Sequence, residues 1–225
     1  MENNSLEKIW KEIRLILKAH PWHGVHIGQN FPEVVTTYIE IVPTDTLKFE
    51  LDKQSGYLKI DRPQLYSNVC PTPYGFIPQT YCGDRVGEFC CEKSGRKGIK
   101  GDGDPLDICV LTEKVITHND IIVNASPIGG LRMIDGDEAD DKIIAIMHKD
   151  NVFGEWDDVS DCPASLINRI KHYFLTYKEA PGAEKRICEI THVYGREEAF
   201  EVIRRSYDDY LEKFSGMNNL LMNRF

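Results

Sequence analysis

Three aspartates lie within six residues of one another and form the strongest chemical signal in the chain. Asp102, Asp104 and Asp107 belong to the run D-G-D-P-L-D, which leads directly into an apolar stretch, residues 108–111. Carboxylates this close repel one another strongly unless cations neutralise them or water solvates the loop fully. Oxygen ligands of this kind select hard ions such as Mg²⁺. The spacing indicates a metal site, with a solvated turn of Asp, Gly and Pro as the plain alternative.

A calcium loop of the EF-hand type is a second alternative. Asp102, Asp104 and Glu113 fall on positions 1, 3 and 12 of that pattern. The middle of the loop argues against it, because position 6, which requires glycine, is Asp107. The residues that follow also have the character of a strand and not of a helix.

A second acidic cluster, residues 135–141, contains Asp135 and Asp140 and is followed by Lys142. Both clusters adjoin apolar segments, so we expect them at strand ends, facing each other. Mg²⁺ keeps several waters and takes only one or two carboxylates per ion. Such a pocket would hold several ions together with a phosphate ligand.

The elements that must position these residues are mostly strands. Period-two or apolar segments predict strands over 34–42, 47–51, 57–60, 107–111, 121–126, 128–134, 142–148 and 186–194. Helical spacing predicts a helix over 5–18 and two late helices within 166–178 and 199–214. Within 47–51, Lys48 and Glu50 share one face. Many short strands followed by late helices predict a mainly β, α+β fold: a small barrel or strongly curved sheet with helices outside.

One domain over residues 1–225 is expected, because no linker or solenoid repeat divides the chain. The Gly-rich, basic segment 82–101 is interpreted as a mobile surface excursion. A net charge of −9 disfavours nucleic-acid and anionic-membrane partners. No export signal or membrane span is seen, and seven cysteines fit reduced thiols, so a cytoplasmic location is expected.

Clustered carboxylates with lysines, arginines and tyrosines, and without an evident Ser-His or Cys-His pair, indicate metal-assisted phosphoryl transfer to water. The run from Asp102 to Asp107 resembles the D-x-D-P-x-D signature of soluble family I inorganic pyrophosphatases. The resemblance extends in order from about Val34 to Lys178, through the segments 38–41, 47–50, 61–62, 74–75, 135–142 and 177–178.

The resemblance implies a five-stranded OB-like β-barrel with peripheral α-helices, a homo-oligomer, and Mg²⁺-dependent hydrolysis of pyrophosphate to two phosphates. Several Mg²⁺ ions per site would activate the attacking water. By the same resemblance, Asp104 is the general base, and Glu40 is an outer carboxylate that helps hold a substrate-associated ion, as is Glu50. The implied metal ligands are Asp102, Asp107, Asp135 and Asp140. The implied substrate-binding residues are Lys48, Glu50, Arg62, Tyr74, Lys142, Tyr177 and Lys178.

Two departures from the family pattern stand out. Cys70 takes a position where the family often has a second active-site tyrosine, four residues before Tyr74, so a hydroxyl is missing. The segment 82–101 is longer than the usual connection. Two other functions remain open: hydrolysis of another phosphoanhydride such as a nucleoside triphosphate, and a non-enzymatic OB-type module that binds nucleic acid.

Overall fold

The computed structural model describes residues 18–179 and 188–216. The helix expected over 5–18 lies outside the described residues apart from Lys18, so that expectation stays a prediction. The strands are β1 (Val35–Ile41), β2 (Leu47–Leu51), β3 (Leu58–Pro63), β4 (Tyr74–Phe76), β5 (Lys100–Gly101), β6 (Asp107–Leu111), β7 (Ile121–Asp135), β8 (Glu138–Ala139), β9 (Lys142–Met147) and β10 (Cys188–Gly195). The helices are α2 (Asp84–Ser94), the 3₁₀ turn η1 (Val159–Asp161), α3 (Ala164–Thr176) and α4 (Arg196–Lys213).

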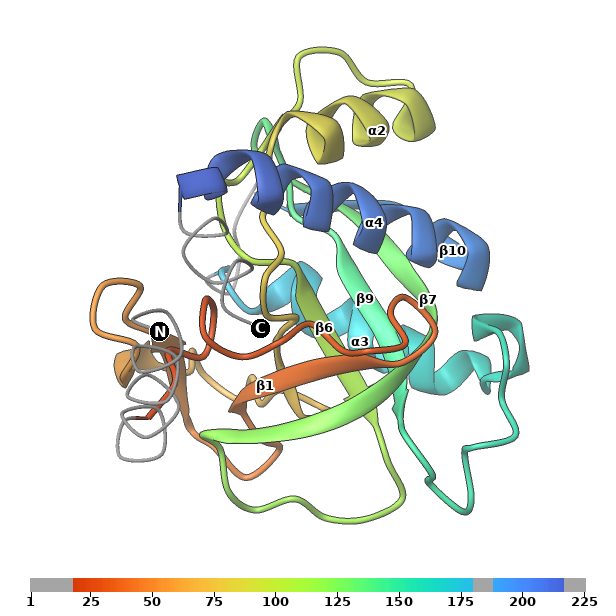
Figure 1. The fold of residues 1–225 in the computed structure, drawn as a ribbon. Helices are drawn as coiled ribbons and strands as arrows, with labels where there is room; N and C mark the ends of the chain where they lie inside the picture. Colours follow the sequence, from red (N-terminus) through yellow and green to blue (C-terminus); the bar gives the residue numbers. More distant parts are fainter. Residues whose placement is uncertain (1–17, 180–187, 217–225) are drawn as a thin grey trace, which may run out of the picture.

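Five strands close into a barrel. Strand β1 pairs with β4, β4 with β6, β6 with β9 and β9 with β7, and the first part of β7 returns to β1. Within this ring the β6–β9 pair is parallel and the other pairs are antiparallel. The five-stranded barrel with helices outside is confirmed (Figure 1).

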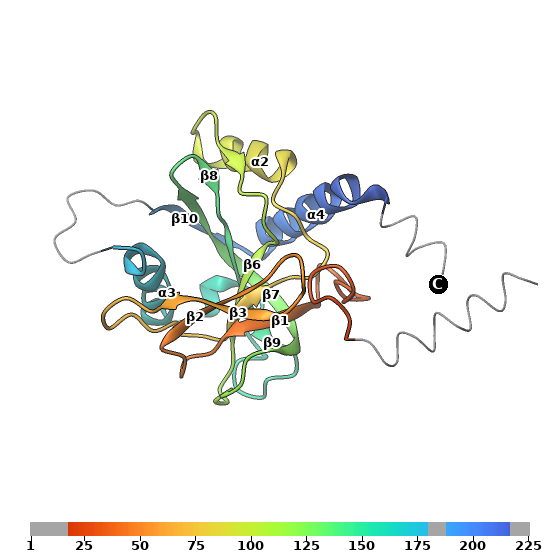
Figure 2. The same ribbon diagram turned by 90° about the vertical axis from the view of Figure 1, so that its left-hand side faces the viewer.

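Alternation along the central strands divides their apolar residues between two cores. On β6 and β9, Ile108, Val110 and Ile143 belong to a core that also includes residues of α2 and α4. Cys109 and Ile144 point the other way, into a core that includes the apolar face of α3. Both faces of these strands are buried, which explains why their sequences are continuously apolar. Figure 2 shows α2 and α4 together on one side of the barrel and α3 on another.

Strand β7 is one continuous element, whereas the sequence predicted two strands separated near Pro127. The pairing of β7 with β9 shifts register between Pro127 and Gly129. A bulge there accommodates a residue that lacks a backbone N–H, so the strand bends without ending. Its long second half then pairs with β10.

Two further elements differ from the expectations. Strand β4, which is not among the expected strands, begins at Tyr74, and a Cβ on Gly75 would lie 1.9 Å from the Tyr38 carbonyl oxygen. Only glycine permits this approach of β1 and β4. The excursion expected over 82–101 contains helix α2, so that interpretation was wrong for residues 84–94. Val86 and Phe89 of α2 are buried in the core shared with α4. No helix in the described residues is both long enough and apolar enough to cross a membrane.

Candidate active site

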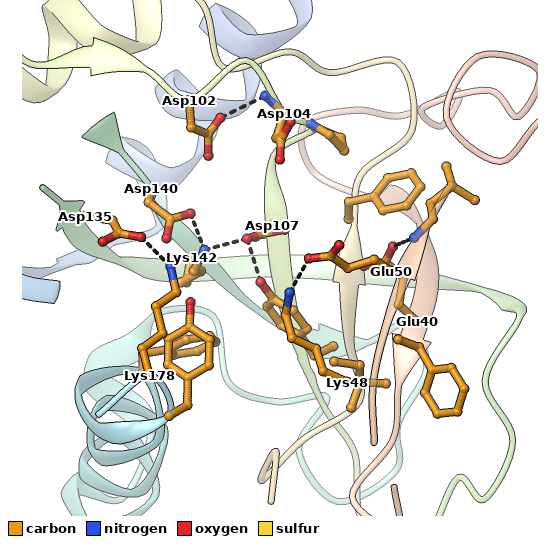
Figure 3. A pocket seen from close by; sticks show the side chains of 18 of the residues that line it. Glu40, Lys48, Glu50, Asp102, Asp104, Asp107, Asp135, Asp140, Lys142 and Lys178 are labelled. Carbon is orange, nitrogen blue, oxygen red and sulfur yellow. Dashed lines mark hydrogen bonds and ion pairs between the residues drawn. The ribbon is translucent and has the colours of Figure 1, made fainter. Parts of the chain in front are cut away.

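A single cavity of about 260 Å³ is lined by side chains from both acidic stretches. Asp107 begins β6, Asp135 ends β7, and Asp140 lies between β8 and β9. Asp102 and Asp104 lie in the loop between β5 and β6. All five aspartates line the cavity, so the two stretches meet as the sequence predicted (Figure 3).

Strand pairing explains this convergence. The parallel β6–β9 pair places Asp107 opposite Lys142. Strand β5 pairs in parallel with β8, so the loop that follows β5 lies beside the connection that follows β8. Gly136, with φ of 65°, forms the tight turn between β7 and β8, and the chain returns antiparallel to β7 with Glu138 opposite Asp135.

Lysines pair with the aspartates of the cavity. The Nζ of Lys142, almost fully buried, donates to Asp107 Oδ2 at 2.5 Å and also to Asp140. Lys178 pairs with Asp135 from the end of α3 (Figure 3). Burial disfavours the charge on Lys142, but the two carboxylates outweigh burial and raise its pKa well above the usual value. Lys142 therefore stays protonated between the two acidic loops.

Two cavity carboxyls have pKa values near neutrality. Burial, with the charge of Asp140 next in size, raises the pKa of Asp102 to about 8. Burial and the charge of Asp107 raise the pKa of Glu40 to about 8. The pKa of Asp107 is also raised, again chiefly by burial. Without further positive charge, the cavity holds more carboxylates than it can keep ionised.

The opposite wall comes from β1 and the β2–β3 hairpin. The Oε1 of Glu40 on β1 accepts a hydrogen bond from the Leu51 amide at 2.7 Å. Lys48 pairs with Glu50, two residues along the same strand, and with Asp61 at 3.0 Å. Lys48 and Glu50 both line the cavity, in agreement with the shared face expected from alternation.

Tyrosines complete the wall on the side of α3. Tyr74 donates its hydroxyl to Asp107 Oδ2 at 2.5 Å. Burial raises the pKa of Tyr177 to about 12, so its hydroxyl stays a donor. The ammonium of Lys142 lies 5.5 Å from the centre of the Phe174 ring. Phenol donors and ammonium groups therefore face the same space as the aspartates.

Arg62 differs from the other expected site residues because it does not line the cavity. Its guanidinium lies 5.9 Å from the Tyr177 ring centre, and its Nη1 atom is buried without a hydrogen-bond partner among the described residues. Cys70 is fully buried and its sulfur donates to the Thr72 carbonyl at 3.3 Å. It contributes to the core under α3 instead of the cavity.

Sequence reasoning missed several cavity residues. Lys53 lies in the turn after β2 and pairs with Asp104. Trp22 and Tyr173 also line the cavity. The signal for Lys53 was its place in a hairpin turn whose preceding strand carries Lys48 and Glu50. Trp22 comes from a segment without periodicity, so the sequence offered no signal for it.

Within residues 18–179 and 188–216, no group of three or more His, Cys, Asp or Glu side chains is arranged to enclose a metal ion. Lysine ammonium groups lie between or against the carboxylates instead. The donors are nonetheless the oxygen-only set that hard divalent cations prefer. Two carboxyls with pKa values of about 8 show that added positive charge would be stabilised here.

Comparisons with known proteins agree with one another. A sequence model described as inorganic pyrophosphatase matches residues 37–211. The inorganic pyrophosphatase of Chlamydia trachomatis serovar L2 is 52% identical over 200 residues, which cover 87% of this chain and 96% of that protein. The crystal structure of inorganic pyrophosphatase from Thermus thermophilus superposes with a TM-score of 0.71 at 27% identity, covering 86% of this chain and 99% of the other. On these matches, the chain belongs to the inorganic pyrophosphatase family.

Proposed function

We propose that this cavity hydrolyses inorganic pyrophosphate to two orthophosphates with the help of several Mg²⁺ ions. Family membership makes the chain an inorganic diphosphatase, a hydrolase that acts on a phosphoanhydride bond. The observation that carries the assignment to this cavity is the convergence of Asp102, Asp104, Asp107, Asp135 and Asp140 on one space that also contains Lys48, Lys142 and Lys178.

Asp102, Asp107, Asp135 and Asp140 are the residues that would hold the divalent cations. When bound, such cations polarise phosphoryl oxygens and lower the pKa of coordinated water. The pKa of Asp102, raised by burial and by the charge of Asp140, supports this role, because a cation beside the carboxylate would offset both effects. Glu40, and Glu50 on the neighbouring strand, would hold waters or an ion at the outer edge.

The chain's own groups would then orient the substrate and move the proton. Lys48, Lys142 and Lys178 offset negative charge on the phosphoryl oxygens, and the Tyr177 hydroxyl donates to the same oxygens. Tyr74 would do so by exchanging its hydrogen bond to Asp107 for one to the substrate. Arg62 does not line the cavity, so the contact with substrate that the resemblance implies for it stays a prediction. Asp104, whose side chain is 47% exposed, would take the proton of the attacking water.

The size and charge of the cavity favour a small anion over a nucleotide. Its volume of about 260 Å³ is below the roughly 300–1,000 Å³ typical of sites for drug-sized ligands. A nucleic-acid module is disfavoured by the net charge of −9 and by the acidic lining. Pyrophosphate is small enough to leave space for the cations that its charge requires.

The decisive experiment is Mg²⁺-dependent release of orthophosphate from pyrophosphate by the wild-type chain and by Asp104→Asn. Loss of the proton acceptor should lower kcat by about 10²-fold or more, because general-base catalysis contributes on that order. Asp137→Asn, an exposed residue of the second acidic stretch outside the cavity lining, is the control and should stay near wild type. ATP is offered in parallel. No release from pyrophosphate, or faster release from ATP, would refute the proposal.

Three broader expectations also remain proposals. We infer a cytoplasmic protein, supported by seven cysteines that are all free thiols in the structure. We also infer a homo-oligomer in which residues 1–225 form one domain. Sedimentation velocity would test the assembly, and a monomer at micromolar concentration would contradict it. No nucleic-acid or membrane partner is proposed.

A further inference from the structure

The β2–β3 hairpin brings a fourth lysine to the cavity. Lys53 lies in the turn between the two strands and lines the cavity from the side of β2. Its Nζ pairs with a carboxylate oxygen of Asp104. We infer that Lys53 is a substrate-contacting residue that places its ammonium on the phosphoryl oxygens beside Asp104. This inference rests on the proposed function of the cavity.

The turn that presents Lys53 is held in one conformation by several contacts. The Oδ1 atom of Asp52 accepts hydrogen bonds from the amide and the hydroxyl of Ser55, at 2.8 and 2.7 Å. Gly56 has φ of 73° and donates its N–H to the Asp52 carbonyl at 2.8 Å. His20 Nε2 lies 3.2 Å from the Lys53 carbonyl oxygen and braces the turn from outside. The backbone of Lys53 is therefore fixed, and only its side chain needs to move.

The pairing of Lys53 explains how it would become available to substrate. Lys142 is shared by two buried or half-buried carboxylates, whereas Asp104 is the single carboxylate that pairs with Lys53 among the described residues. Both side chains are about half exposed, at 54% and 47%. An ion pair so open to water is weak and exchanges readily for another anion. A phosphoryl group arriving next to Asp104 would present that anion.

A plain surface ion pair is the competing interpretation, and Lys59 on the same hairpin shows what such a pair looks like. The Nζ of Lys59 lies 3.6 Å from Asp52, at similar exposure, but Lys59 does not line the cavity. Lys53 and Lys59 therefore have the same charge, the same hairpin and nearly the same exposure. They differ in whether the ammonium faces the reaction space, which makes Lys59 a matched control.

The test compares Lys53→Met, Lys53→Arg and Lys59→Met with the wild-type chain. An ammonium that contacts substrate equally in the ground and transition states affects KM and leaves kcat unchanged. Lys53→Met should raise KM for magnesium pyrophosphate about tenfold, as expected for one charge-assisted hydrogen bond at a partly exposed site. It should weaken binding of the non-hydrolysable analogue imidodiphosphate, measured by calorimetry with Mg²⁺, by a similar factor. Lys53→Arg should recover most of the loss, and Lys59→Met should match wild type.

The outcomes separate this inference from the proposed function. If the wild-type chain does not hydrolyse pyrophosphate, the proposed function fails. If it does, and Lys53→Met binds imidodiphosphate like wild type, the role of Lys53 is refuted while the function stands. A lower kcat with unchanged KM, or an equal effect of Lys59→Met, would also refute it. Thermal melts of all variants accompany the kinetics. If the melting temperature is lowered in Lys53→Met but restored in Lys53→Arg, the KM and the imidodiphosphate affinity of Lys53→Arg decide the question.

Discussion

The pKa values of buried carboxyls in this protein are shifted in opposite directions, depending on the hydrogen-bond donors that surround each carboxyl. Asp102 and Glu40 have pKa values raised to about 8 by burial and by neighbouring carboxylates. Asp150, only 6% exposed, is also disfavoured as an anion by burial, yet its pKa falls to about 2. Its carboxylate accepts hydrogen bonds at 2.8–3.0 Å from one hydroxyl and three amides, those of Thr112, Glu113, Val152 and Phe153. The hydrogen bonds to Asp150 therefore stabilise its anion and the fold, whereas the cavity carboxyls would be stabilised as anions by added positive charge.

Replacing Asp150 with alanine should destabilise the protein by about 2 kcal/mol at pH 7, since a pKa lowered from 3.8 to about 2 corresponds to that order of free energy. The lowered pKa means that this stabilisation is complete above about pH 5 and is lost as the pH falls through the folded-state value. Urea unfolding at pH 7 and pH 3 would measure it. Asp157→Ala, which removes an 86% exposed partner of Arg196, should change stability by less than about 1 kcal/mol. An equal effect of the two substitutions would contradict the assignment.

At the scale of elements, a buried arginine ties the outer helices to the barrel. Arg132 on β7 is fully buried and its Nη1 lies 3.0 Å from Asp141. Its Nη2 lies 2.8 Å from Glu198 at the start of α4. The guanidinium is 5.0 Å from the ring centres of Phe89 on α2 and Tyr194 on β10. Asp141 is the residue between Asp140 and Lys142 in the sequence, and both of these line the cavity. The buried cluster around Arg132 therefore also holds the backbone of this part of the cavity wall.

Arg132→Met should destabilise the fold by roughly 3–5 kcal/mol, because Asp141 would be left buried without its partner. Chemical unfolding with and without the second substitution Asp141→Asn measures the effect, and the double variant should recover part of the loss. Arg205→Met is the control. Arg205 lies 4.4 Å from the same Phe89 ring but pairs with a partly exposed Glu201, so a loss below about 1 kcal/mol is expected. A loss in the control as large as in Arg132→Met would argue against the buried pair.

At the scale of the whole molecule, the cavity couples stability to pH and to divalent cations. Folded-state pKa values of about 8 for Asp102 and Glu40 mean that the folded chain binds protons that the unfolded chain has released. Stability in the absence of cations therefore falls as the pH rises from about 4 to about 8. His23 acts in the opposite sense, since burial lowers its pKa to about 4, but its effect ends near pH 6.5. Above pH 6.5 the buried thiols, whose pKa values are raised chiefly by burial, lower stability in the same sense as the cavity, so the cavity contribution is obtained by comparison with Glu40→Gln.

The melting temperature in EDTA should therefore fall by roughly 10 °C between pH 6.5 and 8.5, on the basis of about 2 kcal/mol for each of the two carboxyls and a few degrees per kcal/mol for a chain of this size. Saturating Mg²⁺ should remove most of the fall, because cations bind the ionised carboxylates of the folded state. Glu40→Gln, which cannot titrate, should show a smaller fall than wild type in EDTA. A constant or rising melting temperature over this interval, with scanning calorimetry as the measurement, would contradict the coupling.

The sequence alone predicted the parts of this protein that depend on local pattern. Period-two alternation located β1 and β2, short apolar runs located β6 and β9, and helical spacing located α3 and α4. The spacing of Asp102, Asp104 and Asp107 indicated a metal site, and the second cluster around Asp135 indicated its other half. Local rules suffice there because strand periodicity and carboxylate repulsion act between residues that are close in the chain.

Only the tertiary structure decided the features that depend on contacts distant in sequence. Strand β4 exists because β1 and β6 pair with a three-residue segment too short to show a period, and α2 forms where a Gly-rich basic stretch packs its few apolar residues against α4. Continuous β7 required a bulge at Pro127 that neighbouring strands stabilise. Lys53 became a cavity residue because a hairpin turn reaches Asp104, 51 residues away in sequence. Such contacts depend on chain closure and packing, which no periodicity records.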